Sequence, residues 1–183
     1  MNLHLKVIEM PKKLREWAEK QEEQQAKHVG THIDVYYKTK LDDSLKECRG
    51  IVLDVRNIEK IGIEILKDKA IRKDDFVIFR TGYMEKFGYG SDSYFSIEKA
   101  PYLTDELVDK LIGIGVKLIG IDFHSIQLGE NHIKIDKYAE SKGTFIVENM
   151  NNLDKVSEIL NLKLRWSQSR EATAIPVFIE SLI

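Results

Sequence analysis

The chain has 183 residues, of which 43% are hydrophobic and 32% charged, and its formal net charge is −2. This length and balance predict one globular domain over residues 1–183. The small net charge, with Lys and Glu mixed along the chain, gives no reason to expect a nucleic-acid partner. Cys48 stands alone, which excludes an internal disulfide and a cysteine-rich zinc motif. A bound metal would therefore need His and carboxylate ligands.

No stretch approaches the roughly 20 apolar residues that are needed to cross a bilayer. The N-terminal residues also lack the basic segment and apolar run of a signal peptide. We therefore expect a cytoplasmic protein without a membrane partner.

The first part of the chain is predicted to contain a strand, a helix and a second strand. Leu3–Ile8 alternates apolar and mixed residues, as in a strand. Pro11 stands at a favoured helix start, and Lys12–Lys27 is rich in Glu, Gln, Lys and Ala, which favours a helix. The β-branched residues of His28–Lys38 favour a strand. The elements expected next are a short turn or helix at Asp42–Lys46, a strand at Gly50–Val55, a helix at Ile61–Lys69 and a strand at Phe76–Arg80.

The second part of the chain predicts further strands and helices in alternation. Thr81–Ser96 is rich in Gly, Tyr and Ser and predicts a long loop, a kind of segment that often carries function. Thr104 is expected to cap a helix through Leu111. The other expected elements are strands at Val116–Asp122, Thr144–Val147, Leu162–Ser167 and Ala174–Ile179, and helices at Asn131–Lys142 and Leu153–Leu160. Together they predict one mixed α/β domain.

The segment around His28 is the densest in groups that bind metals. His28, His32 and Asp34 offer imidazole and carboxylate, which suit Zn, Mn or Fe(II). On a strand they share a face, but four residues of flat strand span about 13 Å. That is too far for both histidines to hold one ion, so either the chain bends at Gly30 or the ligands serve different metals. The alternative is a half-exposed strand with polar residues on its wet face.

Other polar residues stand near the ends of predicted strands. Glu148 follows a buried strand at its C-terminal end, where α/β sheets commonly hold ligands; the alternative is an acid that caps a helix. Asp136, twelve residues earlier, would by itself be a surface carboxylate. His124 and Ser125 lie just past another strand end, where a histidine is more often a hydrogen-bonded structural residue than a ligand.

Four segments, taken together, resemble the cyclase family of metal-dependent hydrolases, which includes bacterial kynurenine formamidases and isatin hydrolases. His28–Asp34 matches the family motif His-x-Gly-Thr-His-x-Asp. Phe79–Tyr83 is similar to its Arg-Thr-Gly-Trp segment, and Gly115–Ser125 to its Gly-Val-x-Leu-x-Gly-Asp-x-Pro-Ser region. Ile146–Leu153 is similar to its Glu-Asn-Leu-x-Asn-Leu segment. The order and spacing of the segments agree from His28 to the C-terminus.

The resemblance implies a swivelling β/β/α domain, assembled as a homodimer or homotetramer. His28, His32 and Asp34 would bind one divalent ion, Zn or Mn. Asp34 and Glu148 would bridge to a second ion where two are present. A water activated by the ion would attack the amide, formamide or lactam carbonyl of a small-molecule substrate. The Thr81–Ser96 loop would line part of the pocket, with Tyr83 stacked on a planar ring of the substrate; the alternative is that its aromatic residues lie at a protein interface.

Two departures from the family pattern concern the chemistry. The family's last motif histidine, a general acid/base, falls at Lys38 here, so Lys38 would carry that role, hold an anionic substrate or stabilise an oxyanion. The family's histidine twelve residues before the glutamate falls at Asp136. Asp136 would then be an oxygen ligand, or the second metal is lost, or His132 supplies the ligand one helical turn away. We also expect His124, Ser125 and His132 to support the site or face the substrate.

These departures leave a second function open: a metal-binding homologue with lost or altered catalysis that serves as a ligand-binding protein. A third, a structural domain without metal, would require the motif match to be accidental.

Overall fold

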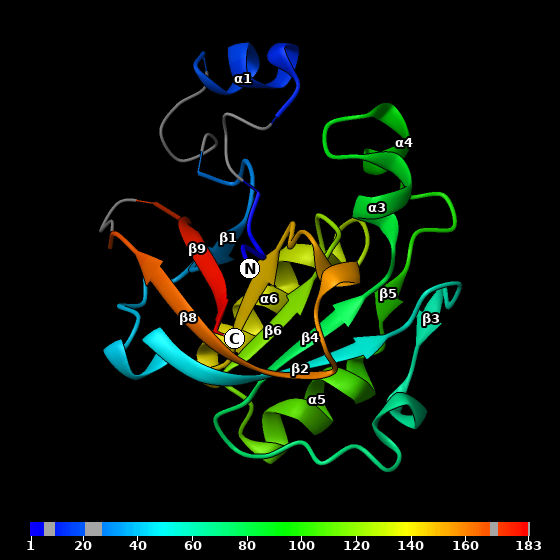
Figure 1. Ribbon diagram of the computed structural model, residues 1–183, viewed down its shortest axis with the longest axis vertical. Helices are drawn as coiled ribbons and strands as arrows, with labels where there is room; N and C mark the ends of the chain where they lie inside the picture. The colour runs from blue at the N-terminus through cyan, green and yellow to red at the C-terminus, as the bar shows by residue number, and fades with distance from the viewer. Residues whose placement is uncertain (6–9, 21–26, 169–171, 183) are drawn as a thin grey trace.

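The computed structural model describes residues 1–5, 10–20, 27–168 and 172–182. Within these residues, seven strands close into a barrel in the order β1-β7-β6-β4-β2-β8-β9 (Figure 1). The barrel strands are β1 (His32–Asp34), β2 (Glu47–Asp54), β4 (Phe76–Arg80), β6 (Leu118–Ile121), β7 (Phe145–Glu148), β8 (Ile159–Trp166) and β9 (Ala174–Leu182).

The barrel combines a parallel half with an antiparallel half. Strands β2, β4, β6 and β7 run parallel, and β8, β9 and the short β1 complete the ring with antiparallel pairs. The β1–β7 pairing sets His32 opposite Glu148. This register brings a residue of the His28–Asp34 motif next to a carboxylate more than a hundred positions later in the chain.

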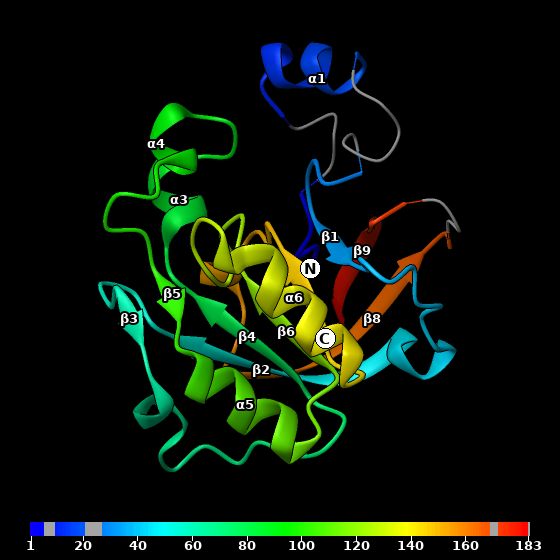
Figure 2. The same cartoon turned by 180° about the vertical axis from the view of Figure 1, so that it is seen from behind.

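The remaining elements lie outside the barrel. The helices are α1 (Lys12–Ala18), α3 (Tyr83–Phe87), α4 (Asp92–Phe95), α5 (Asp105–Ile114) and α6 (Asn131–Ser141), and the 3₁₀ turns are Asp43–Lys46, Ile63–Leu66 and Leu153–Lys155. A small parallel sheet joins β3 (Lys60–Ile61) to β5 (Tyr102–Leu103). Seen from behind, α5 and α6 lie across the parallel strands (Figure 2). No helix among the described residues is long and apolar enough to cross a membrane.

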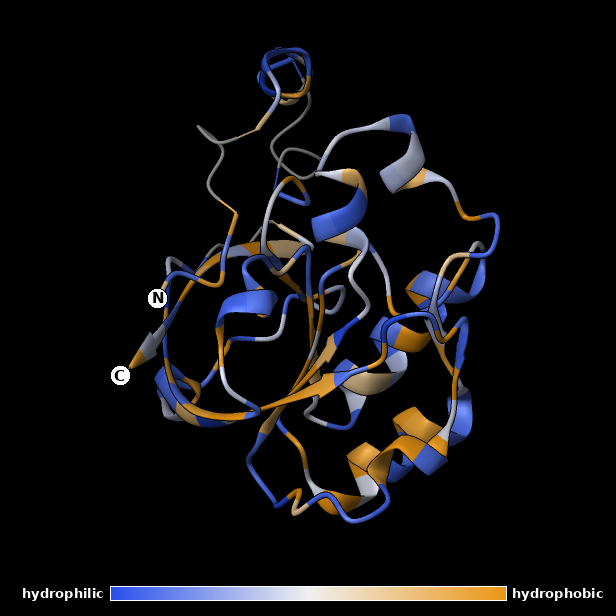
Figure 3. Cartoon of the chain, turned by 45° about the vertical axis from the view of Figure 1, so that its right-hand side comes forward, coloured by the Kyte–Doolittle hydropathy of each residue, from blue (hydrophilic) through white to orange (hydrophobic). Residues whose placement is uncertain are grey.

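Alternate residues of the parallel strands enter two separate cores. On β4, Phe76 and Ile78 belong to a core that β8 and β9 also line, inside the barrel. Val77 and Phe79 belong to the other core, together with Leu107 of α5. Because both faces of β4 are buried from Phe76 to Phe79, that part of its sequence is apolar throughout. Figure 3 shows this as hydrophobic colour along the central strands.

Several expected elements are confirmed with small shifts of their ends. The Thr104 side chain accepts a hydrogen bond from the amide of Leu107, and the α5 helix it caps ends at Gly115, whose φ is +89°. The turn at Asp43–Lys46 is capped by Asp42. The mixed α/β class is therefore confirmed.

Other expected elements are wrong or incomplete. The helix expected at Leu153–Leu160 is wrong: only Leu153–Lys155 turns, and β8 begins at Ile159 because Leu160 enters the barrel core. Only one 3₁₀ turn forms in the helix expected at Ile61–Lys69. The expected loop Thr81–Ser96 contains α3 and α4.

The expectations near the N-terminus are met only in part. The helix predicted over Lys12–Lys27 is present as α1, and residues 21–26 lie outside the described residues. Of the strand predicted at Leu3–Ile8, residues 6–8 lie outside them too, and His4 forms an isolated bridge to Met150.

Candidate metal centre

The chain bends at Gly30, which was one of the two alternatives for the His28–Asp34 motif. Only His32–Asp34 is strand, and Gly30 has φ +80°, a backbone region that glycine enters without strain. The bend turns the His28 ring back, so its centroid lies 5.0 Å from that of His32. The His28 Nδ1 lies 3.3 Å from the Asp34 Oδ1. The bend therefore brings the two histidines much closer together than a flat strand would allow.

A hydrogen-bond network holds this bend. The Gly30 amide donates to the Tyr89 hydroxyl (3.0 Å), and the Gly30 carbonyl accepts from the Asn149 side-chain amide (3.0 Å). The Tyr94 hydroxyl in turn donates to the Asn149 Oδ1 (2.8 Å). The His32 Nδ1 lies 2.9 Å from the same Gly30 carbonyl. Because that nitrogen carries a proton, the His32 Nε2 is the ring atom that is left to bind a metal or another partner.

His28, His32 and Asp34 form what we call the first cluster, in which one ligand atom of each residue lies within 4.8 Å of the others. The His32 Nε2 is 3.6 Å from the Asp34 Oδ1. The other ring nitrogen of His28 bonds the Thr173 hydroxyl at 3.0 Å, which orients the ring. The His28 side chain is 29% exposed, whereas those of His32 and Asp34 are 1% exposed. The first cluster is therefore reached from solvent past His28.

Asp34, His132, Asp136 and Glu148 form the second cluster. His132 and Asp136 are four residues apart on α6, so they share a helix face. The His132 Nε2 lies 3.0 Å from the Asp136 Oδ2 and 3.0 Å from the Glu148 Oε1. The structure thus brings both His132 and Asp136 to this cluster, where the sequence left them as alternatives.

The two clusters are joined by their carboxylates. Asp34 belongs to both, and Glu148 also lies 3.4 Å from the His32 Nε2 through its Oε2. Asp34 and Glu148 each therefore contact residues of both clusters, and their bridging role stays a prediction.

The electrostatic environment of the two clusters favours a bound positive charge. Burial lowers the pKa of His32, but Asp34 and Glu148 outweigh it and raise the pKa to about 10. The same balance between burial and carboxylates raises the pKa of His132 to about 11. Burial, opposed by His132 but aided by two neighbouring carboxylates, holds the pKa of Asp136 well above its usual range. The buried acidic side chains thus favour the protonated forms of His32 and His132, and Asp136 also tends to keep its proton.

The buried atoms fit a divalent metal. Among the described residues, nine buried side-chain nitrogen and oxygen atoms have no hydrogen-bond partner, and seven of them belong to the two clusters. Buried polar atoms are normally paired. With ligand bonds of about 2.0–2.1 Å, tetrahedral geometry separates ligand atoms by about 3.3 Å. The separations of 3.0 to 3.6 Å in the clusters lie around that value.

Lys38 lies on an exposed turn beyond the clusters. Glu140 on α6 fixes this turn, because its carboxylate accepts from the amides of Tyr37 (2.9 Å) and Thr39 (3.2 Å). The Tyr36 ring, in the same turn, lies 6.0 Å from the His28 ring. Burial raises the pKa of the Tyr36 hydroxyl, and the carboxylates of the second cluster raise it further. Tyr36 thus reaches the clusters, and the catalytic role of Lys38 stays a prediction.

The other predicted residues differ in place. Ser125 is buried, and its hydroxyl contacts the backbone of Gln127 within a turn. The Tyr83 hydroxyl donates to the Lys99 carbonyl (3.2 Å), and Tyr83 lines a hollow of about 460 Å³ that no residue of either cluster lines. His124 is half-buried against Phe123, with ring centroids 4.1 Å apart. Substrate roles for Tyr83 and Ser125 stay predictions.

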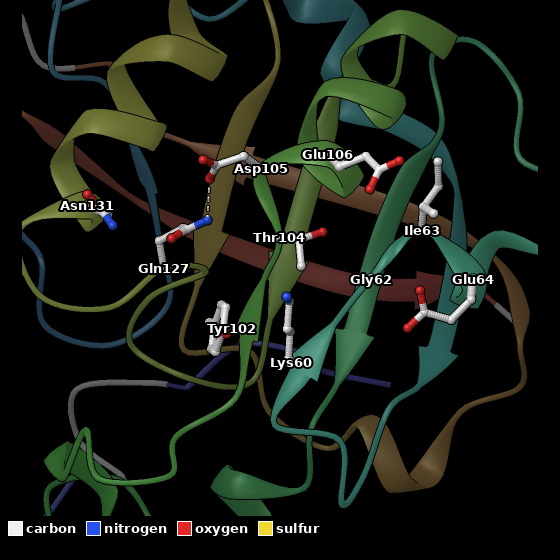
Figure 4. Close-up of a pocket in the computed structure, with 10 residues that line it drawn as sticks. All are labelled: Lys60, Gly62, Ile63, Glu64, Tyr102, Thr104, Asp105, Glu106, Gln127 and Asn131. Atoms are coloured by element: carbon white, nitrogen blue, oxygen red, sulfur yellow. Dashed lines mark hydrogen bonds between the residues drawn. The ribbon is translucent and has the colours of Figure 1, made fainter.

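A second hollow, of about 520 Å³, lies between β3, β5 and α5 (Figure 4). It is lined by mixed polar residues, and no residue of either cluster is among them. The Gln127 amide donates to the Asp105 carboxylate and the Leu103 carbonyl there, both at 2.7 Å. This contact has a structural role at the wall of the hollow.

Sequence reasoning missed the residues that orient the ligands. Tyr89 and Tyr94 lie in the Thr81–Ser96 segment, which was predicted only as a loop, and Thr173 was not singled out. Asn149 was part of the quoted Glu-Asn-Leu segment, and its place directly after Glu148 was the one available signal.

The chain belongs to the cyclase family, because the Cyclase family model matches residues 6–127, two thirds of its length. The matched range contains the first cluster and His124, and ends before α6 and β7. No curated protein sequence matches the chain.

Solved structures with the same fold include isatin hydrolase A from Ralstonia solanacearum, at 16% identity and a TM-score of 0.73, covering 84% of this chain and 71% of that one. Isatin hydrolase A from Labrenzia aggregata, bound to benzyl benzoate, is 16% identical with a TM-score of 0.71, covering 84% of this chain and 73% of that one. A protein described as a predicted metal-dependent hydrolase from Bacillus stearothermophilus is 19% identical with a TM-score of 0.64, covering 84% and 76%. At this identity, the likeness shows the fold.

Proposed function

We propose that the chain is a metal-dependent hydrolase that cleaves a carbon–nitrogen bond of amide, formamide or lactam type in a small molecule. The observation that carries the proposal is the pair of clusters that share Asp34, with seven buried ligand atoms that have no other partner. Membership of the cyclase family and the fold of the isatin hydrolases support the class of reaction.

Each cluster would hold one divalent ion. His28, His32 and Asp34 would hold the first, and two imidazoles in this set suit Zn. The second cluster adds His132, Asp136 and Glu148 around Asp34, and its three carboxylates favour a harder ion such as Mn. A bound divalent ion lowers the pKa of water and polarises a carbonyl oxygen.

The chain's own residues would orient these ligands and receive the substrate. Thr173 and the Gly30 carbonyl fix the two rings of the first cluster, as partners of metal-bound histidines commonly do. His28 and His132, with side chains 29% and 25% exposed, mark the side from which a substrate would arrive. Because Lys38 lies on an exposed turn, we assign it the role of binding an anionic group of the substrate.

We also propose the swivelling β/β/α arrangement and assembly as a homodimer or homotetramer, on the strength of the family resemblance. The alternative of a homologue that only binds ligands is not favoured by any contact in the clusters.

Metal analysis with a hydrolysis assay tests the proposal. Purified chain, stripped and reloaded with Zn or Mn, is expected to hold one or two equivalents and to hydrolyse an aryl formamide or an isatin-like lactam. Asp54→Asn, which changes an exposed carboxylate on β2, is the matched control for Asp34→Asn. Wild-type chain that retains only traces of metal would contradict the proposal. Metal binding without hydrolysis of any amide, formamide or lactam would leave only the ligand-binding alternative.

A further inference from the structure

Hydrolysis of a carbon–nitrogen bond needs a group that takes a proton from water and gives it to the leaving nitrogen. In the proposed centre, the three histidines of the clusters are assigned to ligands, and Lys38 lies on an exposed turn. The proton carrier is therefore expected to be another side chain close to the clusters. Its ring nitrogen or carboxylate must not be engaged by a metal or by another hydrogen bond. This inference rests on the proposed function.

His124 stands beside the end of β7. Strands β6 and β7 run parallel, with Gly120 opposite Val147. The residues that come after β6 therefore lie beside those that come after β7. Two backbone bonds keep them together: the Asn149 amide donates to the Phe123 carbonyl, and the Met150 amide to the Ile121 carbonyl, both at 3.0 Å. His124 is therefore next in the chain to Phe123, which is hydrogen-bonded to Asn149, the residue after Glu148.

Aromatic rings hold the His124 imidazole on its other sides. Its centroid lies 4.1 Å from that of Phe123, 5.7 Å from that of Phe95 and 6.1 Å from that of Tyr94. These apolar contacts offer the ring no hydrogen-bond partner. They restrict its orientation.

The His124 Nε2 is buried and has no hydrogen-bond partner. Of the nine such atoms among the described residues, only this nitrogen and the His4 Nε2 lie outside the two clusters. His4 is engaged elsewhere, because its Nδ1 bonds the β9 backbone at Ile179. A buried ring nitrogen left open beside the clusters can bond a group that arrives with the substrate.

The ring also has the protonation state that a proton acceptor needs. Burial, the largest cause, lowers the pKa of His124; Glu148 opposes this decrease, and His132 adds to it. At neutral pH His124 is therefore a neutral imidazole. In contrast, the pKa values of His32 and His132 are raised above neutrality.

We propose that His124 is the catalytic proton carrier of this centre, the role that the family motif would have placed at position 38. As the water oxygen bonds the carbonyl carbon and the C=O π pair moves to oxygen, the His124 Nε2 accepts the water proton. As the C=O re-forms and the C–N bond breaks, the imidazolium returns that proton to the leaving nitrogen. The products are a carboxylic acid and an amine, and His124 ends neutral.

The kinetic test compares His124→Gln with wild type after each is loaded with metal. We expect unchanged metal content and a fall in kcat of about 10²- to 10⁴-fold, the usual contribution of general acid–base catalysis. His124→Asn is the second variant should His124→Gln not fold. Free imidazole is expected to restore turnover in His124→Gly and not in His4→Gly, the matched loss of a buried histidine. A kcat of His124→Gln within a few-fold of wild type would overturn the proposal.

An NMR measurement tests His124 without turnover. Imidazole ¹⁵N spectra of the metal-free chain are expected to show His124 neutral at pH 7. On loading with cadmium, the resonances of the cluster histidines should become metal-coupled, and that of His124 should not. A metal-coupled His124 would make it a ligand and overturn the proposal. If no histidine couples and wild type hydrolyses nothing, the proposed function has failed instead.

Discussion

The two clusters differ in how the chain assembles them. The first is built almost wholly from seven consecutive residues, because a left-handed glycine folds His28 back on Asp34. The second joins β1, α6 and β7, and depends on packing between segments a hundred residues apart. The first has two imidazoles and one carboxylate, and the second has one imidazole and three carboxylates. The local cluster is therefore suited to a softer ion, and the tertiary cluster to a harder one.

Asp34 is the residue the two clusters share, so its loss tests the comparison most severely. We expect Asp34→Asn to lose both ions and all metal-dependent hydrolysis, since one substitution removes a charged ligand from each site. Metal content by plasma mass spectrometry and the hydrolysis assay measure this. Retention of a full equivalent of metal would show that Asp34 is not shared.

Loss of one histidine from each cluster separates them. His28→Ala is expected to lose the ion of the first cluster and keep the other, and His132→Ala to do the reverse. Calorimetric titration with Zn and Mn counts the remaining sites. Loss of both ions in either variant would show that the two sites do not bind metal independently. Two ions in His132→Ala would show that Asp136 suffices in the second cluster without His132.

The sequence supplied the local cluster and only part of the tertiary one. The motif from His28 to Asp34 could be read directly, with a bend at Gly30 as an alternative. That both His132 and Asp136 join the second cluster could not be read from the sequence, because it depends on whether the face of α6 that the two residues share meets β7. Leu153–Leu160 was misread as helix because its apolar residues, at positions 153, 156, 159 and 160, have a helical spacing, whereas pairing with β2 places Ile159 and Leu160 in a strand. The residues that hold the bend come from distant segments and carry no motif of their own.

Metal binding should release protons, because the carboxylates keep the cluster histidines charged in the metal-free chain. The pKa values of His32 and His132, about 10 and 11, mean that both carry a proton at pH 7. Loading with two ions is expected to release about two protons from these histidines, together with any proton on Asp136, and metal affinity should rise with pH. Calorimetry in two buffers of different ionisation enthalpy counts the protons.

The same pKa values predict a stability change in the metal-free chain. The pKa of His32 is raised above its usual 6.5, so its contribution to stability is present below pH 6.5 and is lost as the pH rises towards 10. The metal-loaded chain, whose His32 is already deprotonated, should not show this loss. Equal pH dependence of urea unfolding in both forms would contradict the proton release.

Gly30→Ala should have the smallest effect and act on the local cluster. A Cβ at Gly30 would lie 2.6 Å from the Met10 Cε and 3.1 Å from the Leu5 carbonyl oxygen, and φ is +80°. We expect a loss of about 1–3 kcal/mol in the free energy of unfolding, measured by urea denaturation. Gly129→Ala, at φ +60° with open space around it, is the matched control for backbone strain alone. A Gly30→Ala loss no larger than that of the control would show that the close packing at the bend costs nothing.

Anomalous scattering from crystals grown with Zn or Mn tests the central claim most directly. One peak is expected among the His28 Nδ1, the His32 Nε2 and an Asp34 oxygen, and a second among Asp34, His132, Asp136 and Glu148. The two peaks should share Asp34. No peak at either cluster under saturating metal, or peaks held by other residues, would contradict the account.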